Sequence, residues 1–360
     1  MRKNKMAGLM AGVLAAALWM TGCSGNGGTE TKPAAAGAET GTETAGTSAE
    51  KEGSQASGEE NKEKEGAALT ENKETGKRAI LVVSFGTSYN ESREATIGAI
   101  EKAIAEAFPE TETRRAFTSQ IIIDKLKERD GLETDNVKEA LDRAAADGIT
   151  ELVVQPTHLM HGAEYDEMME MVDSYRDKFE SVAIAEPLLG EVGSDATVIN
   201  ADKEAVAKAI TAEAVKTAGF DSLDAAAADG TAFVFMGHGT SHTAKVSYSQ
   251  MQAQMNALGY KNVFIGTVEG EPEETACENV IEAVKAAGYT KVVLRPLMVV
   301  AGDHANNDMA GDDEDSWKSQ FEASGEFDSV DCQIAGLGEI ADIQQLYVAH
   351  TKAAVDSLNG

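Results

Sequence analysis

The stretch Ala232-Phe-Val-Phe-Met-Gly-His-Gly-Thr-Ser-His242 decides the fold. Its apolar first half is typical of a strand that is covered on both faces in a parallel sheet. The strand breaks at Gly237-His238-Gly239, and a histidine between two glycines at a strand end lies where the backbone turns and a ligand can come close. We therefore predict a functional site centred on His238.

Strand-like and helix-like segments alternate through the chain from residue 78 onward. In the first half we expect strands at 79–86, 113–118, 150–158 and 181–189, and helices at 91–108, 120–129, 136–147 and 167–179. In the second half we expect strands at 233–236, 262–268 and 290–299, a further apolar stretch at 329–334, and helices at 248–258, 272–287 and 340–358. This βαβ alternation predicts parallel sheets.

Two local matches indicate that the two halves are copies of each other. Phe85-Gly-Thr-Ser88 parallels His238-Gly-Thr-Ser241, and the segment 148–156 parallels 288–296 with Gly, Thr and Pro in shared register. We therefore predict an α/β fold of two duplicated flavodoxin-like or Rossmann-like lobes with parallel sheets. Such lobes form a cleft that is lined by the carboxyl ends of their strands.

The lobes are expected at 78–225 and 226–360, and two further segments precede them. Residues 1–23 run from a basic start through an apolar stretch to a small residue before Cys23, as in a bacterial lipoprotein signal. We expect Cys23 to be lipidated, so that the exported protein is anchored on the extracytoplasmic side of the membrane. Residues 24–77 contain almost no large apolar residue, and we expect a disordered tether.

The charge of the part expected to fold is strongly negative. The signal holds three basic residues and the tether holds 11 Glu against 6 Lys, so residues 78–360 hold 50 acidic and 22 basic residues, a net charge of −28. A surface of this charge repels nucleic acid and anionic lipid, and it favours cations. Solubility outside the cell explains the same acidity, so the acidity alone does not identify a metal protein.

Three side chains at predicted strand ends suit a divalent metal. His158 ends the third strand of the first lobe, Glu186 ends the fourth, and His238 ends the first strand of the second lobe. Two imidazoles and a carboxylate can bind cobalt, iron, nickel or zinc and leave coordination positions open for a substrate. Imidazole also accepts protons near neutral pH. A single histidine at a strand end is more often a structural group, but this fold brings strand ends together.

Other polar residues follow the same strand ends. His161, His242 and Glu269 are candidates to line the cleft or to support the ligands, although hydrogen bonding within the fold is the simpler explanation for the two histidines. The acidic segment 301–317 follows a strand of the second lobe, where it would gather cations at the rim and bring His304 towards a substrate. Its Asp spacing does not match an EF-hand loop, and capping and solvation explain most of its acids.

The sequence does not support several other chemistries. Gly237-His-Gly-Thr-Ser241 lacks the GxSxG pattern of a nucleophile elbow, and no Walker lysine or GxGxxG motif predicts nucleotide binding. Cys277 and Cys332 have no CxxC spacing and no nearby histidine in a ligand pattern, so we expect no zinc-thiolate site.

Several stretches, spread over nearly the whole part from residue 78, share one resemblance. They are Ile80-Leu-Val-Val-Ser-Phe-Gly-Thr-Ser-Tyr89, Arg115-Ala-Phe-Thr-Ser119 with Lys125-Leu126 and Arg129-Asp-Gly131, His158 with Gly162 and Glu164-Tyr165, Phe235-Met-Gly-His-Gly239, and Pro296-Leu-Met298 with Ala301-Gly-Asp-His304 and Asn307-Asp-Met-Ala310. At these residues the sequence is similar to the anaerobic sirohydrochlorin cobaltochelatases. These belong to the class II tetrapyrrole chelatases together with ferrochelatase.

The resemblance implies a chelatase fold and the insertion of Co²⁺ into sirohydrochlorin without ATP, in the cobalamin pathway. In that family two histidines act at the metal site, and they fall on His158 and His238. A carboxylate ligand falls on Glu186, around which there is no distinctive motif. The expected mechanism holds the metal on these three residues while histidine takes up pyrrole N–H protons.

The sequence departs from the family pattern in its export signal and in the additional histidine His161. Corrin synthesis is mostly cytoplasmic, so an exported member would insert metal into scavenged tetrapyrrole. The alternative is an exported lipoprotein that binds a tetrapyrrole or a metal for uptake without catalysis. A product that forms and leaves would indicate the enzyme, whereas a stable stoichiometric complex would indicate the carrier.

Overall fold

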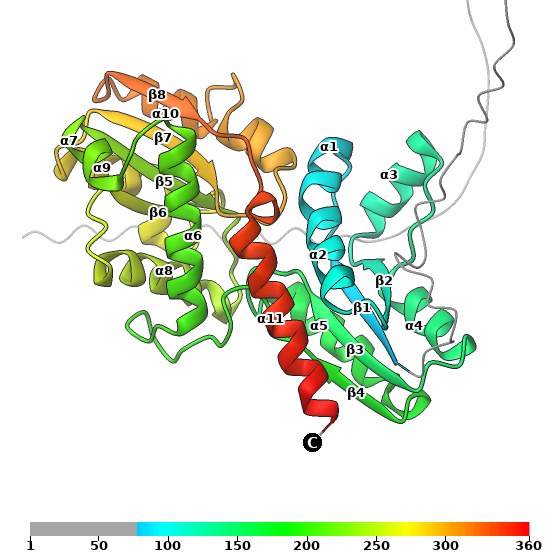
Figure 1. The fold of residues 1–360 in the computed structure, drawn as a ribbon. Helices are drawn as coiled ribbons and strands as arrows, with labels where there is room; N and C mark the ends of the chain where they lie inside the picture. The colour runs from blue at the N-terminus through cyan, green and yellow to red at the C-terminus, as the bar shows by residue number, and fades with distance from the viewer. Residues whose placement is uncertain (1–77, 360) are drawn as a thin grey trace, which may run out of the picture. The chain divides into compact units, whose positions relative to one another are not determined.

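The computed structural model describes residues 78–359 (Figure 1). The predicted signal with Cys23 and the predicted tether lie outside the described residues. In the described part, parallel strands alternate with helices, which confirms the predicted α/β class with two parallel sheets. No helix between residues 78 and 359 is both long enough and apolar enough to span a membrane.

The first sheet has the strand order β2-β1-β3-β4, and all of its pairs are parallel. Its strands are β1 (Arg78–Ser84), β2 (Glu112–Phe117), β3 (Glu151–Pro156) and β4 (Ser181–Ile184). The helices that accompany them are α1 (Asn90–Arg93), η1 (Glu94–Gly98), α2 (Ala99–Ala107), α3 (Gln120–Asp130), α4 (Val137–Ala146), α5 (Ala163–Asp173) and η2 (Arg176–Lys178).

The second sheet repeats this order as β6-β5-β7-β8, again with parallel pairs only. Its strands are β5 (Thr231–Gly237), β6 (Val263–Thr267), β7 (Lys291–Pro296) and β8 (Ser329–Cys332). The helices of this half are α6 (Ala201–Thr217), α7 (Leu223–Ala228), η3 (Thr243–Lys245), α8 (Val246–Ala257), η4 (Glu273–Thr275), α9 (Cys277–Ala286), η5 (Ala305–Met309), α10 (Trp317–Ala323), η6 (Leu337–Glu339) and α11 (Ala341–Leu358).

The strand pairing shows the duplication residue by residue. Val83 of β1 is paired with Pro156 of β3, and Met236 of β5 is paired with Pro296 of β7. The two sequence matches likewise align Val83 with Met236 and Pro156 with Pro296. The glycines that follow β1 and β5 also correspond, because both have a left-handed φ, of 97° and 92°. The two lobes therefore share register and turn geometry.

Among the element boundaries that differ from the sequence expectation, two have a clear physical reason. The apolar run at 181–189 predicts one strand, but β4 ends at Ile184, and Leu188 and Leu189 are fully buried beside the loop that follows β3. The burial of Leu188 and Leu189 explains why both positions are apolar although neither belongs to a strand. The helix expected at 167–179 is α5, which begins at Ala163 because acidic residues in its first turn stabilise the helix start.

Alternate residues of the central strands pack into separate cores on the two faces of each sheet. Leu81 and Val83 of β1 face a core that is completed by α4 and α5. Val82 faces the opposite core, which also contains Phe235 of β5 and residues of α6 and α11. This shared core joins the inner faces of the two sheets.

Two helices pack across the predicted lobe boundary at 225/226. α6, which precedes the predicted lobe boundary at 225/226, packs on α8 and runs beside the sheet of β5 to β8 (Figure 1). α11, at the end of the chain, packs on α2, β3 and β4. Hydrophobic periodicity gives no signal for a helix at 201–217, because its alanines place small apolar groups on every face and leave no amphipathic stripe.

Buried polar contacts fix α11 to the end of β3. The hydroxyl of Tyr347 is fully buried and is shared between the carbonyl oxygens of Thr157 at 3.0 Å and His158 at 3.3 Å. One turn later, the hydroxyl of Thr351 donates to Oε1 of Gln155 at 2.7 Å. Buried carbonyl groups without a partner are costly, so these contacts hold the helix and the strand end in one arrangement.

The substitution Tyr347→Phe should lower the free energy of unfolding by about 1 to 3 kcal/mol, because it removes only the buried hydroxyl and takes this donor from the Thr157 carbonyl, whereas the His158 carbonyl keeps the Leu188 N–H. Urea denaturation of the full chain measures the change. Tyr175→Phe is the matched control, since that hydroxyl donates to Asp142 at the surface. Its loss should stay below about 1 kcal/mol, and equal losses in the two variants would contradict the role assigned to Tyr347.

Candidate active site

His158 follows β3, and its imidazole is buried without a polar partner. The residue is 9% exposed, and neither ring nitrogen has a hydrogen-bond partner among the described residues. Its backbone is well held, because its carbonyl oxygen accepts from the Leu188 N–H at 3.0 Å and from the Tyr347 hydroxyl. Burial lowers the pKa of His158 to about 4, so the ring is neutral at pH 7. A fixed, neutral and unpaired imidazole is suited to gain its partner from a ligand.

The two glycines around His238 are needed for different reasons. A Cβ atom at Gly237 would overlap the ring of Tyr248, whose hydroxyl accepts from the Gly239 N–H at 3.2 Å. Gly239 has a left-handed φ of 92°, and a Cβ atom there would lie 2.8 Å from Cβ of Glu269. The chain therefore turns tightly after β5 and leaves His238 exposed at the strand end.

The hydrogen bonding of His238 fixes its tautomer. Nδ1 lies 2.8 Å from the carbonyl oxygen of Gly239, which can only accept, so Nδ1 carries the proton. Neutral His238 therefore has its lone pair on Nε2. That nitrogen can bind a metal ion or take up a proton.

A second histidine lies beside His238. The rings of His238 and His304 meet edge to face, with their centroids 4.6 Å apart. Nδ1 of His304 lies 2.6 Å from Oδ2 of Asp308, so Nδ1 donates to the carboxylate, which orients the ring. The sequence places His304 only at the rim of the cleft, and the structure brings it to His238.

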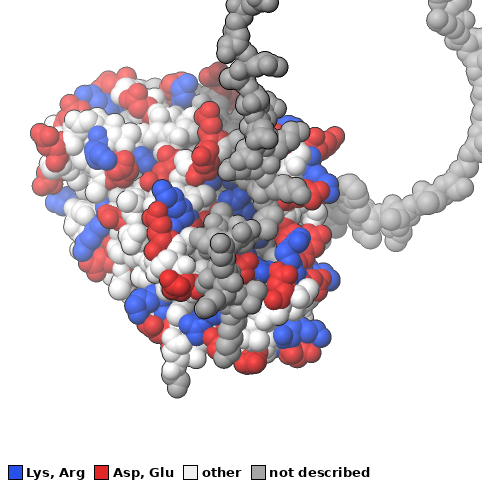
Figure 2. All heavy atoms as spheres, turned by 45° about the vertical axis from the view of Figure 1, so that its right-hand side comes forward, with Lys and Arg blue, Asp and Glu red and all other residues white. Residues whose placement is uncertain are grey.

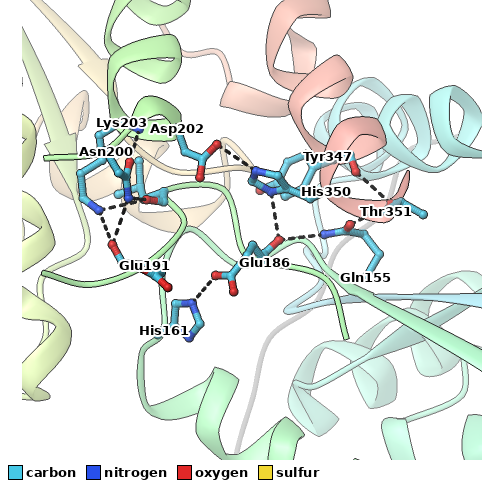
Figure 3. A network of polar contacts seen from close by, with 11 residues as sticks. Gln155, His161, Glu186, Glu191, Asn200, Asp202, Lys203, Tyr347, His350 and Thr351 are labelled. Atoms are coloured by element: carbon cyan, nitrogen blue, oxygen red, sulfur yellow. Dashed lines mark hydrogen bonds and ion pairs between the residues drawn. The ribbon is translucent and has the colours of Figure 1, made fainter. Parts of the chain in front are cut away.

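The carboxylate of Glu186 is directed to His161 (Figure 3). Its Oε2 lies 2.7 Å from Nε2 of His161, and this hydrogen bond is the main cause of the lowered pKa of Glu186. Within residues 78–359, no group of three or more His, Cys, Asp or Glu side chains is placed to hold a metal ion. The ligand set of His158, Glu186 and His238 stays a prediction, and Glu186 would have to leave His161 to join it.

The backbone around Glu186 is fixed by α6 and α11 (Figure 3). Nδ1 of His350 lies 3.1 Å from the carbonyl oxygen of Glu186, and Nε2 lies 3.1 Å from Oδ1 of Asp202. Lys203 is fully buried and donates to two carbonyl oxygens of the loop after β4, at 2.9 Å and 2.7 Å. Burial lowers the pKa of Lys203 to about 8. The backbone of the loop after β4 is thus held at several carbonyl groups, whereas the Glu186 carboxylate is held by the side chain of His161 alone among the described residues.

The remaining candidate residues have partners within the fold. Nδ1 of His242 accepts from the Ala244 N–H at 3.1 Å, so Nε2 carries the proton that faces Oδ2 of Asp166 at 3.2 Å. This contact joins α5 to the loop after β5. Glu269 donates its backbone N–H to the carbonyl oxygen of His238 at 2.9 Å, and its side chain is exposed.

Glu164, at the start of α5, is a further residue of the site. Loss of solvent raises the pKa of Glu164, although the residue keeps some exposed surface, and the charge of His238 opposes the rise. The carboxyl group therefore lies within electrostatic reach of His238. Glu164 occurs in a stretch that carries the family resemblance, but only the tertiary fold relates the start of α5 to the end of β5.

The site is asymmetric although the fold is duplicated. Each candidate metal ligand has an apolar counterpart in the other half, given by the sequence matches and by the backbone hydrogen bonds that follow β4 and β8. The pairs are His238 and Phe85, His158 and Met298, and Glu186 and Ile334. Phe85 and Ile334 are 44% and 47% exposed. One set of strand ends thus offers metal ligands, and the equivalent set offers apolar surface.

A cavity of about 670 Å³ lies where α1, α3 and the loop after β7 meet. Its lining combines polar, cationic and apolar side chains, among them Tyr89, Lys125, Arg129, Asn306 and Ile334. The loop after β7 lines the cavity through Ala301 and Asn306 and also carries His304. The cavity and the histidine pair are therefore connected through one loop.

Comparison with known proteins identifies relatives over the whole described part. The family model for cobalt chelatase (CbiK) matches residues 78–356. The chain is 36% identical over 280 residues to the sirohydrochlorin cobaltochelatase of Salmonella typhimurium, in an alignment that covers 78% of this chain and 97% of that protein. It is 33% identical over 287 residues to sirohydrochlorin cobaltochelatase CbiKC of Nitratidesulfovibrio vulgaris, covering 79% of this chain and 92% of that protein.

A solved structure has a similar fold. SirB from Bacillus subtilis with Fe³⁺ is similar with a TM-score of 0.54 at 14% sequence identity, covering 79% of this chain and 98% of that chain. This likeness supports the chelatase fold that the resemblance implies. With the family model matching residues 78–356, the chain belongs to the cobalt chelatase (CbiK) family.

Proposed function

We propose that this chain is a sirohydrochlorin cobaltochelatase, which inserts Co²⁺ into sirohydrochlorin and releases two protons without a nucleotide. The observation that carries the proposal is the buried His158 imidazole, whose ring nitrogens have no partner among the described residues. Such a group in a cobalt chelatase is best explained as a ligand that receives the metal. The activity printed for both curated relatives supports the same substrates.

We assign the capture of Co²⁺ to His158 and His238. Imidazole nitrogen suits this ion, and both rings can present an unprotonated nitrogen to it. Burial lowers the pKa of His158 and keeps that ring neutral. In neutral His238 the Gly239 carbonyl holds the proton on Nδ1, which leaves the lone pair of Nε2 for the metal. Glu186 is proposed as the third ligand, reached by a turn of its carboxylate away from His161.

The pyrrole N–H protons need acceptors that are not occupied by the metal. A histidine that binds Co²⁺ through Nε2 cannot take a proton at that atom, so a neighbouring base is required. His304 fits this role, because Asp308 holds its Nδ1 and stabilises the imidazolium that forms. Glu164 is a second acceptor near His238, with a pKa raised by loss of solvent.

The macrocycle is proposed to enter through the cavity beside α3. Its volume of about 670 Å³ is in the range of small-molecule sites. The exposed apolar residue Ile334 gives a surface for the conjugated ring. The loop shared with His304 brings the ring centre to the histidines, so the metal and the macrocycle approach from different sides.

Metal insertion by the full chain, followed through the visible absorption of sirohydrochlorin after addition of Co²⁺, tests the proposal. We expect turnover above the uncatalysed rate, and a loss of about 100-fold or more in His158→Ala and His238→Ala. A retained spectral shift on adding the metal-free macrocycle would show that these variants still bind it. A stoichiometric complex without turnover in the unchanged chain would identify a carrier and exclude the enzyme.

Acid should weaken the fold through His158. Its pKa is about 4 in the folded state, against 6.5 for an ordinary histidine, so the unfolded chain binds more protons between these values. Stability therefore falls as the pH drops through this window. Between pH 7 and pH 4.5 the unchanged chain should lose about 2 to 3 kcal/mol more than His158→Leu, measured by urea denaturation. Parallel losses in the two chains would contradict the buried, neutral state of His158.

Asp308→Asn should lower kcat for cobalt insertion about tenfold or more, because the amide no longer stabilises protonated His304. Binding of the metal-free macrocycle should be unchanged, as measured by its fluorescence. Asp312→Asn is the control, since Asp312 lies in the same acidic segment with a fully exposed side chain. If kcat is the same in both variants, His304 is not the proton acceptor.

A further inference from the structure

The face of α3 that lines the cavity carries two cations one turn apart. Lys125 and Arg129 stand at i and i+4, so their side chains share one side of the helix. Like charges at this spacing repel each other, and an anion bound between them would relieve the repulsion. Ile121, a further turn earlier on the same side, is 79% exposed. The helix thus presents an apolar residue followed by two positive charges.

The charged groups of both residues have donors to spare. The Lys125 ammonium forms no hydrogen bond or ion pair with another residue between 78 and 359. Arg129 is held by Asp130, which accepts from both Nε, at 2.8 Å, and Nη2, and by Asn90, which accepts from Nη2 at 2.6 Å. These contacts orient the guanidinium, offset part of its charge and leave Nη1 out of the bonds. By contrast Lys127, which does not line the cavity, lies 3.4 Å from the carboxylate of Glu133.

Acidic and basic side chains are otherwise interspersed over the surface, as the face in Figure 2 shows. In a folded part that carries a net charge of −28, two cations with unused donors on one helix face offer a place where an anion can bind. The cavity lining also includes the carboxylates Glu91 and Glu339, on α1 and η6. Glu339 accepts from the Gly336 N–H at 2.8 Å, and the lining cations that can bind an anion both lie on α3.

We propose that Lys125 and Arg129 bind two peripheral carboxylates of the tetrapyrrole and thereby orient the macrocycle in the cavity. This inference rests on the proposed function. Sirohydrochlorin carries carboxylate side chains around an apolar conjugated ring, so its edge matches the two cations and its face matches Ile334. With the edge held by α3, the ring centre is turned towards the loop that carries His304.

Titration of the full chain with metal-free sirohydrochlorin, without cobalt, tests this anchoring through the fluorescence of the macrocycle. The double variant Lys125→Gln/Arg129→Gln should raise the Kd about tenfold. Added NaCl should weaken binding to the unchanged chain more than binding to the variant, because the lost contacts are ionic. In the insertion assay the loss should appear in KM and not in kcat.

Lys127→Gln is the matched control, because it removes the same charge from the same helix outside the cavity. Its Kd should stay within about twofold of the unchanged chain. The inference is overturned if the double variant binds as tightly as the unchanged chain, or if Lys127→Gln weakens binding equally. If the unchanged chain binds no sirohydrochlorin at all, the proposed function itself fails, so the two failures are distinguishable.

Discussion

The hydroxyl of Tyr347 fixes the position of His158, and much of the structure depends on this contact. It satisfies two carbonyl groups at the end of β3 where no strand continues. His158 can remain rigid while its own ring lacks a partner, because its backbone is bonded by Tyr347 and by Leu188. An imidazole that stays neutral and unpaired in the interior needs such a support.

Duplication supplies two equivalent sets of strand ends, and their side chains differ in chemistry. One set carries the candidate ligands His158, Glu186 and His238. The other carries Phe85, Met298 and Ile334, of which Ile334 lines the cavity. In the proposed function a hydrated cation and a conjugated ring must both reach the same point. A symmetric pair of sites would treat these two substrates alike, whereas the observed division gives each a surface of matching polarity.

The sequence predicts the two sheets and the strand-end positions of His158 and His238, because apolar runs and glycine turns are local signals. It does not predict the partners of the site residues. Glu186 meets His161, and His304 meets His238, only because loops from different strands converge in the fold. Helix α6 is not predicted from the sequence either, because an alanine-rich segment has no preferred face until a neighbouring core selects one.

The position of α11 determines when, during synthesis, the first sheet can complete its core. The inner face of the first sheet, with Ile80 and Val82, shares its core with Ile343 and Tyr347 of the last helix. A chain emerging from the ribosome completes all four strands of that sheet long before this helix exists. The first half must therefore keep part of an apolar face uncovered until α11 has been synthesised, so the first sheet completes its packing only after the second.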